Sequence, residues 1–259
     1  MKTEFTSVLY RVENRIASIT LNVPKKLNAL DVTLAKDLTA ALALAAGDDA
    51  VKVVVVTGAG RAFCAGGDLA YMAGLDLEGC IDFVRDAQAL IGAFTKMPKP
   101  VIAAVNGFAV GAGFSLVLLS DIVISSDKAM YGLAFVNIGV IPDLAALYFL
   151  PRVIGLQKAK ELAFSGKNID AGEACRLGIV NSVVEHDKLE EEVGKMSLFL
   201  AGQPGAAVGA AKTLLNMGMD MGLDELLEME ALAQGVRMVS DDSREGVDAF
   251  LNKRKPNFK

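Results

Sequence analysis

The stretch that decides the fold is KPVIAAVNGFAVGAGFSLVLLSDIVI, residues 99–124. A membrane-spanning helix needs roughly 20 predominantly apolar residues, and this stretch is long enough to raise that possibility. However, Asn106, Ser120 and Asp121 interrupt it, and three glycines crowd its middle. We therefore predict a buried strand over 101–105, a glycine turn, a buried helix and a further buried strand. No membrane partner is expected.

Strands and helices alternate outward from this stretch through about residue 185. Asp31 is a favourable helix N-cap, because a short acidic side chain can accept a hydrogen bond from the first turn. The predicted strands are 8–12, 16–21, 51–57, 101–105, 121–125 and 180–184, and the predicted helices are 31–46 and 78–96. Such alternation is typical of an α/β protein.

Beyond residue 185 the pattern is helical only. Leu226, Met229, Ala233 and Val236 are spaced for one face of a helix. An apolar stripe of this kind needs another surface to cover it. We therefore predict two regions: an α/β core over 1–195 that carries the functional sites, and a helical region over 196–259 that mediates oligomerisation.

Composition narrows the classes of function. The 259 residues carry a net charge of −5, which argues against a nucleic-acid partner, because phosphate binding usually requires a basic balance. Cys64, Cys80 and Cys175 are odd in number and fit no zinc spacing, so we interpret them as reduced thiols of a cytoplasmic protein with no metal site. The N-terminus has no apolar run typical of a secretory signal.

Two glycine-rich loops each follow a predicted buried strand. They are RAFCAGGDL at 61–69 and NGFAVGAGFS at 106–115, and neither matches a nucleotide-binding motif. Glycine allows close approach of the backbone to a ligand, and a helix N-terminus presents unpaired N–H groups. Such loops suit a site that stabilises a developing oxyanion, although ordinary turn glycines remain an alternative for either loop alone.

Five segments, in order along nearly the whole chain, resemble the crotonase superfamily, which is the enoyl-CoA hydratase/isomerase family. They are LNVPKKLNAL (21–30), VVVVTGAGRAFCAGGDL (53–69), KPVIAAVNGFAVGAGFSLVLLSDIVI (99–124), SGKNIDAGEACRLGIVNSVV (165–184) and SREGVDAFLNKRKPNFK (243–259). The resemblance implies a crotonase-like spiral of ββα units with a C-terminal helical region. It also implies an acyl-CoA substrate, no separate cofactor, and a homotrimer or hexamer.

The resemblance also assigns site residues. The backbone N–H groups of Gly67 and Ala112 would form the oxyanion hole. The residues implied to contact coenzyme A are Lys25 and Lys26 near the phosphates, Ala65 in the adenine pocket, and Phe250 and Lys253, which would reach coenzyme A on a neighbouring subunit.

This chain departs from the family at two positions. Hydratases of the family use two glutamates, where this chain has Ser115 and Phe135, which we assign to the acyl pocket. Neither side chain alone can serve as a proton-transfer base. Asp143 lies where some isomerases of the family carry their catalytic acid, and it could also, or instead, cap a helix that begins after it. The single histidine, His186, is expected at the surface.

The preferred prediction is therefore an enoyl-CoA isomerase. It would move a double bond through a thioester dienolate, with Asp143 as the base and the Gly67 and Ala112 N–H groups as the oxyanion hole. One alternative is an enoyl-CoA hydratase or hydrolase with atypical catalytic residues. Another is an acyl-CoA-binding protein without catalysis.

Overall fold

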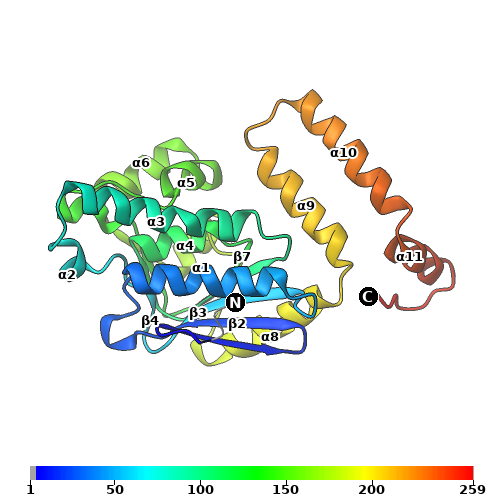
Figure 1. The fold of residues 1–259 in the computed structure, drawn as a ribbon, viewed down its shortest axis with the longest axis horizontal. Coiled ribbons are helices and arrows are strands. Elements are labelled where there is room, and N and C mark those ends of the chain that lie inside the picture. Colours follow the sequence, from blue (N-terminus) through cyan, green and yellow to red (C-terminus); the bar gives the residue numbers. More distant parts are fainter. Residues whose placement is uncertain (1–3, 259) are drawn as a thin grey trace.

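Two mixed sheets organise the computed structural model, which describes residues 4–258 (Figure 1). The larger sheet has the order β1-β2-β3-β5-β7-β10, in which only β1 and β2 pair antiparallel. Its strands are β1 (Val8–Glu13), β2 (Ile16–Leu21), β3 (Val53–Gly58), β5 (Val101–Val105), β7 (Ile122–Ser126) and β10 (Ser182–Val184). The smaller sheet has the order β4-β6-β8-β9, with strands β4 (Ala62–Cys64), β6 (Phe108–Val110), β8 (Met130–Gly132) and β9 (Asn168–Asp170).

Successive ββα units generate the two sheets. β3 and β4 lead into α2 (Leu69–Met72) and α3 (Leu77–Thr95), and β5 and β6 lead into α4 (Ala112–Leu119). In each unit the first strand joins the large sheet and the second joins the small one, which confirms the spiral that the family resemblance implied. The strands of the small sheet are three residues long, too short to show the two-residue alternation by which a strand is recognised in sequence.

The first long helix, α1 (Val32–Gly47), begins as predicted. The Asp31 carboxylate accepts a hydrogen bond from the Leu34 N–H at 2.9 Å, which satisfies one of the free donors of the first turn. Leu34, Leu38 and Leu42 are fully buried against the core. Burying each leucine side chain contributes roughly 1.5–3 kcal/mol, so this stripe fixes the helix on the sheet.

The remaining helices divide into a core set and an arm. The core set is α5 (Ala146–Ile154), α6 (Leu156–Ser165), α7 (Ala171–Arg176) and α8 (Leu189–Ala201), together with short 3-10 turns at 24–26, 134–138 and 186–188. α8 packs on the large sheet, with Leu189 and Val193 in a second, smaller apolar cluster. The predicted region boundary at residue 196 therefore falls inside a helix that belongs to the core. In residues 4–258 no helix is both long and apolar enough to cross a bilayer.

The arm consists of α9 (Gly205–Met217), α10 (Leu223–Met238) and α11 (Asp241–Leu251), and it projects away from the core (Figure 1). One buried amine attaches it. Lys212 Nζ donates hydrogen bonds to Asp121 Oδ2 at 2.6 Å and to the carbonyl of Phe94 at 2.8 Å, and Asp121 also accepts from the Val101 N–H. Asp121 thus has a structural role.

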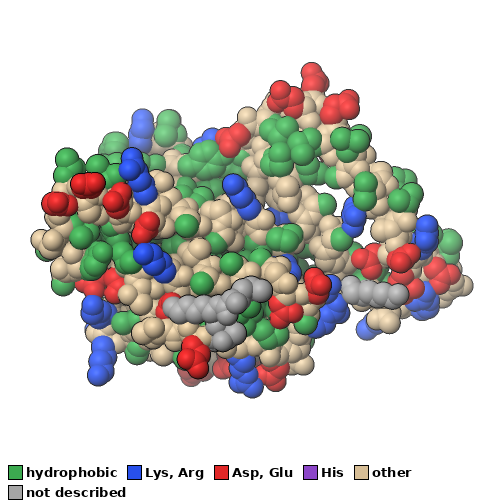
Figure 2. All heavy atoms as spheres, in the orientation of Figure 1, with side chains coloured by type: hydrophobic (Ala, Val, Ile, Leu, Met, Phe, Trp, Pro, Cys, Tyr) green, Lys and Arg blue, Asp and Glu red, His purple; other side chains and the backbone are tan. Residues whose placement is uncertain are grey.

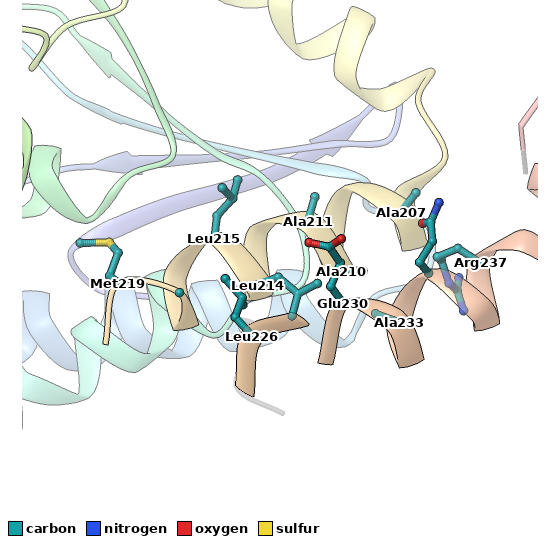
Figure 3. Close-up of a pocket in the computed structure, with 12 residues that line it drawn as sticks. Ala207, Ala210, Ala211, Leu214, Leu215, Met219, Leu226, Glu230, Ala233 and Arg237 are labelled. Atoms are coloured by element: carbon teal, nitrogen blue, oxygen red, sulfur yellow. The ribbon is translucent and has the colours of Figure 1, made fainter. Parts of the chain in front are cut away.

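The outer helix of the arm is largely uncovered. No residue of α10 is buried, and Leu232 and Val236 are more than half exposed. An apolar groove of about 630 Å³ lies between α9 and α10. Figure 3 shows Leu214, Leu226 and Ala233 along it. Apolar side chains are also visible along the arm in the space-filling view, beside interspersed acidic and basic ones (Figure 2).

Candidate active site

The two glycine loops touch each other at the start of α4. Gly66 has φ +112° and Gly111 has φ +54°, both in the region that disfavours residues with a Cβ. A Cβ on Gly111 would lie 3.3 Å from the Cα of Gly66, and a Cβ on Gly66 would lie 3.3 Å from the carbonyl oxygen of Val110. Glycine at both positions is therefore what lets the loops approach.

This approach brings two free backbone donors to one cavity. Within residues 4–258, neither the Gly67 N–H nor the Ala112 N–H donates a hydrogen bond, and both residues line the same cavity. Their surroundings are held firmly: the Leu30 N–H bonds to the Gly66 carbonyl at 2.7 Å, and the Asp68 N–H bonds to the Leu30 carbonyl at 2.9 Å. Ala112 is also the first residue of α4, where the helix dipole favours negative charge. Two such donors can stabilise an oxyanion.

The cavity has a volume of about 690 Å³ and is lined mainly by apolar side chains. Helices α2 and α3 contribute one part of the lining with Met72 and Phe83, and residues 134–145 contribute another. Ala65, Phe135 and Asp143, which the sequence assigned to the site, also line it. The contribution of α2 and α3 to the cavity was not predicted. Their apolar residues have a helical spacing, which is the only signal in the sequence, and such spacing usually indicates residues that pack in a core.

Asp143 supplies the carboxylate of this cavity. Its Oδ1 is buried without a hydrogen-bond partner in the described chain, and burial raises the pKa of the carboxyl to about 6. The helix-cap interpretation of this residue is wrong, because Ala145 occupies the N-cap of α5 and no side chain caps that helix. A carboxyl group with a pKa near neutrality in an apolar cavity can both accept and return a proton.

The backbone turns sharply directly after Asp143. Leu144 has φ +47° and Ala145 has φ +60°, so two consecutive residues with side chains adopt left-handed conformations. This conformation costs roughly 1–2 kcal/mol per residue for residues other than glycine. The turn buries the Leu144 side chain and leaves Asp143 facing the cavity.

The two positions that depart from the hydratase pattern behave differently. Phe135 is nearly buried, lines the cavity and lies beside the Gly111 loop, as expected of an acyl-pocket residue. Ser115 is fully buried and does not line the cavity, contrary to the prediction. It lies on α4, and its hydroxyl donates to the backbone carbonyl of Asp143 at 3.1 Å.

Apart from Ala65, the predicted coenzyme A contacts lie outside the cavity. Lys26 Nζ forms an ion pair with Asp68 Oδ2 at 2.6 Å, and its ammonium holds the pKa of the Asp68 carboxyl below its usual value. Asp68 also caps α2, because its side chain accepts hydrogen bonds from the Ala70 and Tyr71 N–H groups, so its role is structural. Lys25 is exposed beside Lys26, while Phe250 and Lys253 lie on and after α11 in the arm, where the Phe250 side chain is 83% exposed.

His186 is only partly exposed, contrary to the expectation of a surface residue. Its Nδ1 lies 2.9 Å from the Ser126 hydroxyl, and Ser126 is fully buried at the end of β7. A nucleophile must reach its substrate, so a hydroxyl sealed in the core does not form a Ser-His site. Across residues 4–258 no group of three or more His, Cys, Asp or Glu side chains is placed to hold a metal ion.

The two sheets, the ββα spiral and the paired backbone donors define a protein of the crotonase fold. Residues 11–259 match the profile of the family described as enoyl-CoA hydratase/isomerase, and the chain belongs to that family. A Rhodobacter capsulatus protein described as "Probable enoyl-CoA hydratase" is 39% identical over 98% of both chains. The 1,2-epoxyphenylacetyl-CoA isomerase of Escherichia coli is 37% identical over 97% of both. The crystal structure of an enoyl-CoA hydratase from Bacillus anthracis matches with a TM-score of 0.94 at 34% identity, over 98% of this chain and 99% of that one.

Proposed function

We propose that this acyl-CoA enzyme is an isomerase that moves the double bond of an enoyl thioester. One observation carries the proposal: among the residues that line the cavity, Asp143 is the only carboxylate, and it shares the cavity with the free N–H groups of Gly67 and Ala112. Proton abstraction next to a thioester needs one base and a means of stabilising the enolate. The cavity offers both.

The reaction would proceed in two proton transfers. The thioester oxygen accepts hydrogen bonds from the Gly67 and Ala112 N–H groups, which makes the C2 proton of a 3-enoyl thioester more acidic. The ionised Asp143 carboxylate removes that proton and becomes the neutral acid, while the dienolate charge is held at the oxygen. The same acid then delivers the proton to C4, giving the 2-enoyl product and restoring the carboxylate. A pKa of about 6 suits both steps.

Hydration is the second candidate, supported by the hydratase names among the relatives. Adding water requires a polar group that orients the water molecule besides the base. The cavity offers Phe135 on one side, and the Ser115 hydroxyl is directed to the Asp143 carbonyl instead of the cavity. These two placements favour isomerisation over hydration. Binding of acyl-CoA without turnover is the third possibility.

The test is to incubate the purified protein with 3-enoyl-CoA and, separately, with 2-enoyl-CoA, and to identify products by chromatography and mass. We expect wild type to shift the double bond with no change in mass. Asp143→Asn should lose roughly 10²–10⁴-fold in rate, the usual contribution of a general base. Asp187→Asn, which changes an exposed carboxylate outside the cavity, is the matched control.

A product heavier by one water molecule would replace the isomerase proposal with the hydratase one. Unchanged substrates in wild type, together with measurable acyl-CoA binding, would support the non-catalytic alternative.

We also propose that the arm assembles the chain into a homotrimer or hexamer. The exposed apolar residues of α10 and the groove beside α9 need a covering surface. In such an assembly Phe250 and Lys253 would contact coenzyme A bound to a neighbouring subunit, which accounts for their distance from the cavity in their own chain. Sedimentation of wild type and Leu232→Glu tests this: the charged variant should shift toward monomer, and an unchanged mass would contradict the proposal.

A further inference from the structure

The hydroxyl of Ser115 connects two parts of the site that are far apart in sequence. Ser115 is fully buried, and its Oγ lies 3.1 Å from the Asp143 carbonyl oxygen and 3.4 Å from the Gly111 carbonyl oxygen. A serine hydroxyl carries a single proton. The shorter contact, to Asp143, is therefore the stronger candidate for the hydrogen bond.

The helix that carries Ser115 also carries an oxyanion donor. Ala112 is the first residue of α4 and Ser115 lies one turn further along the same helix. An eight-residue helix moves as a rigid unit, because its residues are fixed by its own hydrogen bonds. The Ser115 hydroxyl therefore attaches the Asp143 segment to the same rigid element that places the Ala112 N–H.

Asp143 Oδ1 has no hydrogen-bond partner in the described chain, so no hydrogen bond at that atom fixes the direction of the carboxyl group. The direction of the side chain must come from its backbone. The Asp143 carbonyl accepts two hydrogen bonds, one from the Ser115 hydroxyl and one from the Ala146 N–H at 3.0 Å. The second of these lies inside the left-handed turn at Leu144 and Ala145 and moves with it. Of these two hydrogen bonds, only the first joins the turn to another element, alongside the packing of the buried Leu144 side chain in the core.

The residues before Asp143 provide little further restraint. Ile138 is 49% exposed and Ile141 is 76% exposed, so this side of the segment has few packing contacts. A segment with few buried contacts opens more easily than its surroundings. Fixing its carbonyl to α4 would therefore have a large effect on where the carboxyl lies.

We propose that Ser115 is a positioning residue, whose buried hydroxyl fixes the position of the Asp143 carboxyl relative to the Gly67 and Ala112 N–H groups. Its effect on rate rests on the proposed isomerase function. Its effect on the carboxyl group itself does not, and that difference separates the two ideas experimentally. A displacement of about 1 Å in a catalytic group can cost about 10²-fold in rate.

The kinetic test compares Ser115→Ala and Ser115→Cys with Ser120→Ala. Ser120 is a matched control, because it lies at the other end of α4 and its hydroxyl donates to the Leu116 carbonyl at 3.0 Å, away from the cavity. We expect kcat to fall about 10- to 100-fold in Ser115→Ala with KM changed less than about twofold. Cysteine is similar in size but a weak donor, so Ser115→Cys should also lose kcat. Full activity in Ser115→Cys would show that the hydroxyl contributes only packing and would overturn the proposal.

A titration that needs no turnover provides the second readout. The Asp143 carboxyl is followed by carbon-13 NMR of aspartate-labelled protein, with Asp143→Asn identifying its signal. Wild type and Ser120→Ala should titrate near pH 6, and Ser115→Ala should titrate closer to the ordinary value of 3.8, because a released carboxyl turns toward water. An unchanged midpoint in Ser115→Ala would overturn the positioning role, whether or not wild type proves to be an isomerase.

Discussion

The two sides of the cavity are built on opposite principles. The oxyanion side, residues 65–68 and 111–113, uses two backbone N–H groups. The peptides on both sides of Gly67 are hydrogen-bonded to Leu30, and the Gly111 N–H beside Ala112 donates to the Gly132 carbonyl. The acid side, residues 139–145, uses one carboxyl group with an unpaired oxygen on a segment that has exposed apolar neighbours. The first side depends on the space that glycine leaves, and the second on the burial of a titratable group.

This difference determines which substitutions each side tolerates. Side-chain chemistry on the oxyanion side matters little, because the donors belong to the backbone, whereas added volume there is harmful. On the acid side, a substitution that keeps the shape but removes the charge is expected to lower the rate of the proposed reaction. Four measurements separate these two sensitivities, and the effect expected decreases from the first to the last.

The largest effect is expected for Gly66→Ala on the oxyanion side. The new Cβ would lie 3.3 Å from the Val110 carbonyl oxygen at φ +112°, so the loop must shift and move the Gly67 N–H. Loss of one oxyanion donor typically lowers kcat about 10²–10³-fold. Gly155→Ala is the control, because Gly155 has φ +79° with nothing within 4 Å of a Cβ. Equal kcat values for the two variants would show that loop geometry does not matter.

The second effect is on stability and concerns the acid side. The folded-state pKa of Asp143 is about 6, above the ordinary 3.8, so the folded protein binds the proton more tightly than the unfolded chain. Stability therefore falls as pH rises from about 4 to about 6 and stays lower above that range. The full difference corresponds to about 3 kcal/mol.

Denaturant unfolding of wild type and Asp143→Asn measures this effect. Between pH 4 and pH 8, the free energy of unfolding of Asp143→Asn should rise relative to that of wild type by about 3 kcal/mol. A gap between the two proteins that stays constant with pH would mean that the carboxyl is solvated in the folded protein.

The third prediction concerns the pH dependence of activity. Because the base must be ionised to remove the C2 proton, kcat/KM should decrease about tenfold for each pH unit below about 6. Gly66→Ala should show the same acidic limb at a lower overall rate, since it leaves Asp143 unchanged. If the midpoint of the acidic decrease in kcat/KM shifted in Gly66→Ala, the oxyanion side would influence the pKa of Asp143, and the two sides would not be independent.

The smallest effect is expected at Ala145. Its φ of +60° is strained for alanine, so Ala145→Gly should relieve roughly 1–2 kcal/mol of strain, offset by the 0.5–1 kcal/mol entropic cost of glycine. The net gain in unfolding free energy is about 1 kcal/mol. Ala146→Gly, one residue further and inside α5, should instead lose stability by up to about 1 kcal/mol. If both variants lost stability alike, Ala145 would not be strained.

The same contrast explains what could be predicted from sequence. The glycine loops were visible because each follows a predicted buried strand, but ordinary turns were an alternative for either loop alone, and the family resemblance assigned Gly67 and Ala112 to an oxyanion hole. The apolar runs of β3 and β5 predicted two strands of the large sheet directly. The α1 cap at Asp31 followed from a local rule that tertiary structure did not override.

The acid side was harder to predict, because its properties are not local. Asp143 precedes an apolar run with the spacing of a helix cap, and only the left-handed pair at Leu144 and Ala145 moves the start of α5 beyond its reach. Nothing in the residues around Ser115 indicates that its hydroxyl bonds to a carbonyl 28 positions away. The short strands of the small sheet likewise depend on pairing between distant segments.

The buried contact between Lys212 and Asp121 has a consequence for the order in which the chain is made. The Asp121 carboxylate is synthesised first, and the ammonium that neutralises it follows 91 residues later. Domains generally begin to fold from the N-terminus as they emerge, so a nascent core would present the partly exposed Asp121 carboxylate to solvent before its cation is made. The core therefore lacks this ion pair, and the packing of α9 on it, until that helix has been made. The sheets that form the active site therefore reach their full stability only after α9 has left the ribosome.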